Sequence, residues 1–199
     1  MTANLATLLR HSTAIACTCL AITMKADAAS EKILFDFQTA THYPAWQIVN
    51  DDVMGGLSTS RFQFLTNGGA VFSGAVSLEN NGGFASVRSS PVGENLRGLD
   101  AFALRVRGDG RRYKFTVRTE SGFDTPIYQC AFPTQRGEWQ EHRLLFKDFV
   151  PTFRGRVLTD VPPLDPARVT SVGLLISEKQ DGPFQIELSW IKAAPLARK

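Results

Sequence analysis

The chain has 199 residues, of which 43% are hydrophobic and 21% charged, the balance of an ordinary globular protein. This composition excludes a disordered chain, a coiled coil and a collagen-like repeat. The formal net charge of +3 is too small to indicate a protein that binds nucleic acid.

The first 28 residues have the pattern of a bacterial secretory signal peptide. A weakly basic start precedes an uncharged, mostly apolar run of about 13 residues, shorter than the ~20 that a membrane-spanning helix needs. Ala26-Asp27-Ala28 then supplies small residues where a signal peptidase cuts. We expect cleavage near Ala28–Ala29, one domain over residues 29–199, no membrane span after cleavage, and a periplasmic or secreted protein.

Apolar and polar residues alternate with a period of two along the rest of the chain, which is typical of β-strands. Glycine-rich turn signals separate the alternating runs. About eleven strands follow, which predict an all-β sandwich: residues 33–37, 46–49, 61–65, 70–78, 84–88, 101–107, 112–119, 127–132, 138–145, 169–177 and 184–191. A short helical turn is expected to start at Lys147, and residues 150–167, with four prolines, to form a long loop.

The densest polar segment runs from Trp46 to Ser58. Asn50, Asp51 and Asp52 are consecutive, so at most two of them can point the same way from an extended backbone. Their oxygens would suit calcium, but an Asx turn followed by a Gly-Gly reversal is the favoured interpretation. The candidate binding or structural residues of this segment are Trp46, Asn50, Asp51, Asp52, Met54, Gly55, Gly56 and Ser58. Positive φ angles are expected to explain both glycines.

A second polar segment covers residues 78–88, and a glycine pair again permits a tight turn. Its candidate residues are Asn80, Gly82, Gly83, Phe84 and Arg88. Arg88 is the only cation in either segment, and its planar fork can clamp a carboxylate. We expect Asp51 or Asp52 to be that partner, in a bridge that joins the two segments at the rim of the sandwich.

The strands at residues 101–107 and 112–119 each alternate apolar residues with basic ones, which predicts a basic face. Its residues are Arg105, Arg107, Arg112, Lys114 and Arg118. This face is either an ordinary solvated sheet face or a groove for an acidic partner or an anionic glycan. Nucleic acid is excluded because no aromatic side chains interleave there.

Motifs for catalysis are missing from the chain. It has no Cys-x-x-Cys pair, no His-Glu-x-x-His, no Gly-x-Ser-x-Gly and no phosphate-binding glycine loop. Only His42 and His142 remain after residue 28. Cys130 is then the one remaining cysteine, so no internal disulfide is expected, and it is interpreted as a small buried hydrophobe. We therefore expect no enzyme activity, no cofactor and no metal.

The polar segments together resemble the complex I intermediate-associated protein 30 family. The resemblance rests on residues 50–58, on residues 80–88, on Leu99 to Gly110 and on Val172-Gly173 followed by Gly182-Pro183-Phe184, and it extends over about residues 33–193. It implies a galactose-binding-like jelly roll similar to certain carbohydrate-binding modules. Mitochondrial members of the family are assembly factors that hold membrane-arm intermediates of respiratory complex I. This leader lacks the Arg-rich amphipathic character of a mitochondrial transit peptide, which indicates an exported bacterial homologue.

Two functions follow from these observations. The first is a non-catalytic protein-binding module, chaperone-like or an assembly factor, with a protein partner. The alternative is a carbohydrate-binding module in which exposed aromatic side chains stack on sugar rings. The candidates for such stacking are Tyr43, Trp46, Tyr128 and Trp139, although core packing is the more common role for such residues.

Overall fold

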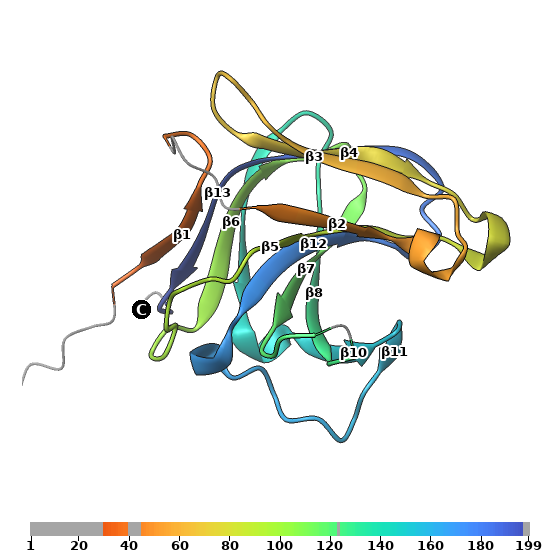
Figure 1. Ribbon diagram of the computed structural model, residues 1–199. Coiled ribbons are helices and arrows are strands. Elements are labelled where there is room, and N and C mark those ends of the chain that lie inside the picture. The colour runs from red at the N-terminus through yellow and green to blue at the C-terminus, as the bar shows by residue number, and fades with distance from the viewer. Residues whose placement is uncertain (1–29, 40–44, 123, 197–199) are drawn as a thin grey trace, which may run out of the picture.

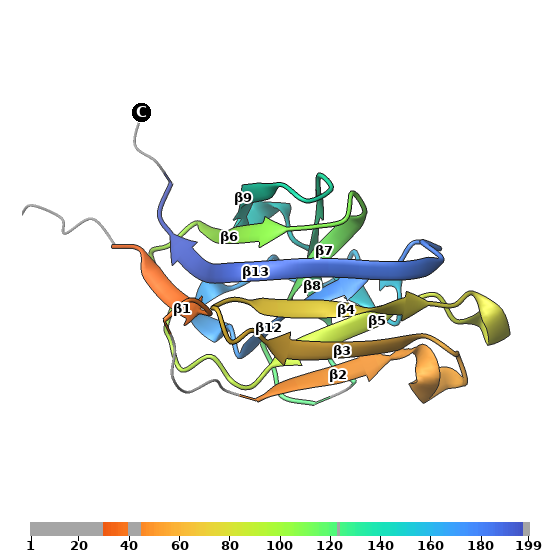
Figure 2. The same ribbon diagram turned by 90° about the horizontal axis from the view of Figure 1, so that it is seen from above.

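Two antiparallel sheets face each other in the computed structural model, which describes residues 30–39, 45–122 and 124–196 (Figure 1). The first sheet has β13 (Gly182–Ala194) at its centre, between β4 (Ala70–Val76) and β6 (Ala101–Arg107). Its outer strands are β3 (Thr59–Phe64) beside β4 and β9 (Trp139–Leu145) beside β6, and β1 (Lys32–Asp36) also pairs with β13. Figure 2 shows β13 running the length of this sheet.

The second sheet has seven strands. In spatial order they are β11 (Arg156–Val157), β10 (Val150–Phe153), β8 (Ile127–Pro133), β7 (Arg112–Arg118), β12 (Ser171–Ile176), β5 (Ala85–Ser89) and β2 (Trp46–Asn50). The remaining elements are short 3-10 turns: η1 (Asp51–Met54), η2 (Glu79–Asn81), η3 (Phe146–Asp148) and η4 (Pro166–Arg168). The all-β sandwich that the alternation predicts is confirmed.

The core lies between the sheets because every second residue of each strand turns inward. On β6 the inward side chains Phe102, Leu104 and Val106 are fully buried, and Phe102 packs on Phe115 of β7 with ring centroids 5.0 Å apart. Burying one such side chain stabilises the fold by about 1.5–3 kcal/mol. The sequence places these residues correctly because the pattern has an unambiguous period of two.

The structure has each of the eleven strands expected, with ends shifted by up to three residues, and two that were not expected. Residues 150–167 are not loop throughout, because β10 and β11 form a hairpin there. Arg154 and Gly155, both at positive φ, make its two-residue turn. Pro151 lies within β10, although a proline has no N–H to donate and so makes a strand less expected from sequence. The expected helical turn is η3.

Candidate functional site

The two polar segments meet at one end of the sandwich, where η1 and η2 lie side by side (Figures 1 and 2). Asp51 joins them. One carboxylate oxygen accepts a hydrogen bond from the Ser58 amide at 2.9 Å. The other accepts from the Ser58 hydroxyl at 2.5 Å and from the amides of Gly83 and Phe84 at 2.6 and 3.2 Å. A single side chain therefore fixes both segments to each other.

Asp51 is fully buried, yet its hydrogen bonds keep it ionised. Burial alone raises the pKa of this carboxyl, but the bonds from Ser58, Gly83 and Phe84 outweigh burial and hold the pKa below its usual range. The buried negative charge is thus stabilised by oriented N–H and O–H groups, and no cation is needed to neutralise it.

Three glycines are needed around Asp51, one for its backbone conformation and two because a side chain would not fit. Gly55 ends η1 at φ +87°, a conformation that glycine adopts without strain. Gly56 is required for a different reason, because a Cβ there would overlap the Asp51 carboxylate. A Cβ on Gly82 would lie 2.6 Å from an Asp51 oxygen. Positive φ therefore explains Gly55 but not Gly56, which corrects the sequence-based expectation.

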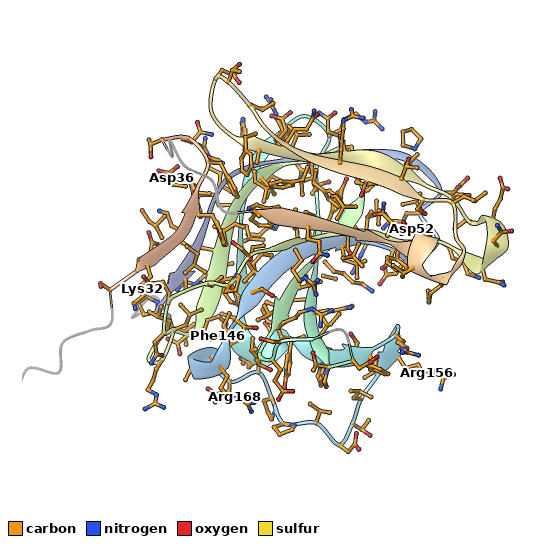
Figure 3. The ribbon with its side chains drawn as sticks, viewed as in Figure 1. Lys32, Asp36, Asp52, Phe146, Arg156 and Arg168 are labelled. Carbon is orange, nitrogen blue, oxygen red and sulfur yellow. The ribbon has the colours of Figure 1, made fainter. Side chains whose placement is uncertain are left out.

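The two segments that Asp51 joins carry four exposed apolar side chains, which we call the apolar tip: Val53, Met54, Leu57 and Leu78. Their exposed fractions are 69%, 63%, 52% and 41%. A hydrogen bond from the Asn80 side-chain Nδ2 to the Gly55 carbonyl, 3.2 Å long, ties the two halves of the tip together. Asp52 and Glu79 are exposed beside it, and Figure 3 shows Asp52 on η1.

The other residues of the predicted rim have mixed roles. Asn50 is buried and accepts a hydrogen bond from Ser60 at 2.7 Å. Phe84 contributes its backbone amide to Asp51. Trp46 lies at the far end of β2 from the tip and packs on Phe62, with ring centroids 4.6 Å apart. Met54 is the rim candidate that is both apolar and well exposed.

The expected bridge between Arg88 and Asp51 or Asp52 is wrong. Arg88 lies four residues beyond the segment that reaches Asp51, and its guanidinium donates to the Gln47 side chain at 2.6 Å. Asp51 uses backbone amides and a serine instead. Asp52 accepts from the Val53 amide at 3.1 Å. The expected contact between the two segments is confirmed, but a carboxylate and amides make it.

A calcium site was the alternative for this segment. Among the residues that the structure describes, no group of three or more His, Cys, Asp or Glu side chains is placed to hold a metal. Both Asp51 oxygens already accept hydrogen bonds from the protein. The 3-10 turn η1 takes the place of the expected Asx turn.

The five basic residues do not form one face, because consecutive strands β6 and β7 belong to different sheets. Arg105 and Arg107 lie on the first sheet, where both guanidinium groups approach the Trp139 ring, at 5.2 and 5.1 Å. Arg112, Lys114 and Arg118 lie on the outer face of the second sheet. The alternation was read correctly, but the chain crosses between the sheets at the turn after β6.

The aromatic candidates for sugar stacking are mostly occupied elsewhere. Tyr128 is buried and donates to the Pro162 carbonyl at 2.9 Å. Trp46 stacks on Phe62. Trp139 is 38% exposed, and both Arg105 and Arg107 approach its ring. Tyr43 lies outside the described residues.

Sequence reasoning did not single out Val53, Leu57 and Leu78 as site residues. A usable signal was present: all three residues sit next to glycine or asparagine turns, Val53 and Leu57 lie outside any alternating run, and Leu78 is the last residue of one. Cys130 packs against the core but is half-buried, where the sequence predicts a buried residue, and burial raises the pKa of its thiol.

Comparison with known proteins shows that the sequence of this chain matches a protein family. A family model described as Complex I intermediate-associated protein 30 matches residues 35–188. The mitochondrial protein of that name from Drosophila melanogaster is 27% identical over 181 residues, covering 80% of this chain and 61% of the relative. The Mus musculus protein is 28% identical over 180 residues, with 80% and 55% covered. The chain thus spans little more than half the length of these relatives.

Solved structures share the fold at low identity. The Family 11 carbohydrate-binding module of a Clostridium thermocellum cellulase superimposes with a TM-score of 0.61 at 13% identity, covering 86% of this chain and 98% of the module. The agarase AgWH50C gives a TM-score of 0.57 at 13% identity, with 86% of this chain and 25% of the agarase covered. These values establish the jelly-roll fold and carry no inference about ligands.

The periplasmic or secreted location predicted from residues 1–28 is contradicted, because the curated relatives are mitochondrial by name. That prediction used a segment outside both the described residues and the matched region, so neither the fold nor the family constrained it. Within the part of the chain that the structure describes, no helix combines the length and hydrophobicity needed to cross a bilayer.

Proposed function

We propose, since the chain belongs to the complex I intermediate-associated protein 30 family, that it is a non-catalytic protein-binding module that assists the assembly of respiratory complex I. The observation that carries this proposal is the apolar tip. Four of the nine large apolar side chains exposed in the described residues gather there, on a base fixed by Asp51. Grouped exposed apolar residues are characteristic of protein interaction sites.

The tip supports binding more than catalysis. Asp51, its one buried carboxylate, is engaged by Ser58, Gly83 and Phe84 and so has a structural role. The apolar side chains, in contrast, lie on or beside the short turns η1 and η2 and are exposed to solvent. A base that is already rigid lowers the entropy lost on association.

The chemistry of the partner follows from the charges around the tip. Asp52 and Glu79 are exposed there, and the two segments that build the tip, residues 50–58 and 77–84, contain no basic residue. A complementary partner surface has apolar side chains at its centre and lysine or arginine at its edge. We assign that surface to a subunit of a complex I assembly intermediate.

The test is complementation in cells that lack their own copy of the protein. Native gels and the NADH:ubiquinone oxidoreductase activity of the membranes measure the amount of assembled enzyme. The unaltered chain should restore assembly, and Val53→Asp should restore much less, because a charge in the tip must be desolvated on docking. Full assembly of complex I in the deleted cells would overturn the proposed role.

Val157→Asp is the matched control. Val157 is 64% exposed, close to the 69% of Val53, and lies on β11 at the far edge of the second sheet. The same substitution there should restore assembly fully. If both aspartate variants failed alike, the effect would come from the added charge and the tip would not be the docking surface.

A further inference from the structure

The strand β9 forms one outer edge of the first sheet, beyond β6 (Figure 2). It pairs with β6 along all seven of its residues without a register shift, and it contains no proline or glycine. A long and regular edge strand presents a row of unpaired backbone groups to which another strand can add.

The other sheet edges in the described part of the chain are shorter, irregular or covered. β11 has two residues, and the pairing of β1 with β13 contains a register shift. β2 and β3 lie beside each other, and Trp46 of β2 stacks on Phe62 of β3. Natural sheets use such features to avoid pairing with other chains. β9 is neither short nor irregular, and no described strand covers its outer side.

The backbone of alternate β9 residues faces the open edge. The Phe146 amide, directly after the strand, donates to the Asp100 carbonyl at 2.8 Å, in register with the pairing of β9 and β6. Because the backbone groups of successive residues point to opposite sides of an antiparallel strand, those of Glu141, Arg143 and Leu145 point away from β6. No hydrogen bond between described residues reaches them there.

The side chains of β9 are complementary to a second copy of the same strand. His142 is the middle residue of the strand, so a two-fold axis at His142 pairs β9 with itself over its full length. This antiparallel register places Glu141 opposite Arg143 of the second copy, and Trp139 opposite Leu145, and each pairing occurs twice. An axis at Glu141 or at Arg143 would instead place like charges opposite each other.

Glu141 and Arg143 are exposed and can make this contact. Glu141 belongs to none of the ion pairs among the described residues. Its neighbour on β6, Arg105, lies over the Trp139 ring at 5.2 Å. Arg143 donates to the Pro195 carbonyl, and its guanidinium has further N–H groups for a carboxylate.

His142, on the axis, packs on Phe132 of β8 with ring centroids 4.9 Å apart. Burial lowers the pKa of His142, so its ring is neutral at neutral pH. Two copies of this residue therefore add no repulsion between like charges where the strands meet.

We propose that β9 is a dimerisation edge, through which two copies of this chain pair antiparallel about His142 and join their first sheets into one. The charge complementarity of Glu141 and Arg143 is what assigns the edge to a second copy. Pairing would also place Leu145 of the second copy against Trp139, which is 38% exposed. The proposal does not rest on the proposed function, because β9 contains no residue of the apolar tip.

The test measures the mass of the full chain by analytical ultracentrifugation over a range of concentrations. The unaltered chain should form dimers. Glu141→Arg and Arg143→Glu should each weaken the dimer by about tenfold or more, because each brings like charges together at both pairings. A mixture of the two variants should dimerise again, since every pairing in a mixed dimer joins opposite charges. Thermal melting verifies that each variant is folded.

Arg61→Glu is the matched control, because it makes the same charge reversal on β3, at the other side of the same sheet. It should change the dissociation constant of the dimer by no more than about twofold. Equal weakening by Arg61→Glu, a mixture that stays monomeric, or an unaltered chain that is monomeric at every concentration would overturn the proposal. Val53→Asp should dimerise normally, so failure of the β9 edge and failure of the tip give different results.

Hydrogen exchange identifies what occupies the edge. The amides of Glu141, Arg143 and Leu145 should exchange more slowly in the dimer than in the diluted monomer. Equal exchange in the two states would show that the dimer uses another surface, against the proposal. Protection that appears only when complex I assembly intermediates are added to a monomeric chain would overturn the second copy as the occupant.

Discussion

Asp51 carries a full negative charge in a place that water does not reach. An isolated carboxylate would be very costly there, and the fold offsets that cost with donors from three points of the chain: Ser58, Gly83 and Phe84. The neighbouring Asp52 has the same functional group but is exposed. From sequence the two aspartates could not be told apart, because the difference arises from which one faces the second segment.

Asp51 should give the protein a distinct sensitivity to acid. Its pKa in the folded state is below the ordinary value of 3.8, so the unfolded chain takes up this proton more readily. The stability from Asp51 is therefore fully present above pH 3.8 and is lost as the pH falls through the folded-state pKa. The free energy of unfolding should fall by up to about 1.4 kcal/mol per pH unit from this group.

Chemical denaturation of the unaltered protein and of Asp51→Asn, from about pH 5 to about pH 2.5, measures this dependence. Asp36 and Glu178 also have lowered pKa values, but they are present in both proteins. The difference between the two curves therefore isolates Asp51, and it should shrink toward low pH. A constant difference across the range would show that Asp51 does not titrate as the geometry requires.

At the scale of elements, the turns that carry the tip depend on the absence of side chains at chosen positions. Gly56→Ala should lower the free energy of unfolding by about 2 kcal/mol or more, because its Cβ would displace the Asp51 carboxylate from its donors. Gly93→Ala is the control, since a Cβ there meets no atom within 4 Å, and it should change stability by less than about 0.5 kcal/mol. Equal losses in the two variants would mean that Gly56 acts only through backbone freedom.

The strands could be predicted from sequence, but their assignment to one sheet or the other could not. Strands such as β6 and β7 were predictable, because local alternation determines which side chains face inward. Which sheet each strand joins depends on contacts between distant residues, so the basic residues of β6 and β7 could not be separated from sequence. The meeting of residues 50–58 and 80–88 was predictable from the family resemblance and the jelly roll, whereas the Arg88 partner was not.

For the whole molecule, stability comes from packing between the sheets, in which Phe102 is fully buried. Its ring contacts Phe115 across the core and Phe146 of η3, with centroid distances of 5.0 and 4.8 Å. Phe102→Ala should lower the free energy of unfolding by about 3–5 kcal/mol. The melting temperature of Phe102→Ala should be lower by about 10 °C or more, given the size of the domain. Val157 is exposed on β11, so Val157→Ala should have the same melting temperature as the unaltered protein. A loss of stability in Val157→Ala as large as in Phe102→Ala would contradict the role given to Phe102.

The central strand of the first sheet, β13, follows every other strand in chain order. It pairs with β1, β4 and β6, so these earlier strands cannot complete their sheet until it arrives. During synthesis on a ribosome, or passage through a translocation pore, the β3–β4 hairpin and the β6–β9 strand pair emerge as separate pieces with their apolar sides uncovered. Folding must then wait for the end of the domain, which lengthens the time that the chain depends on chaperones.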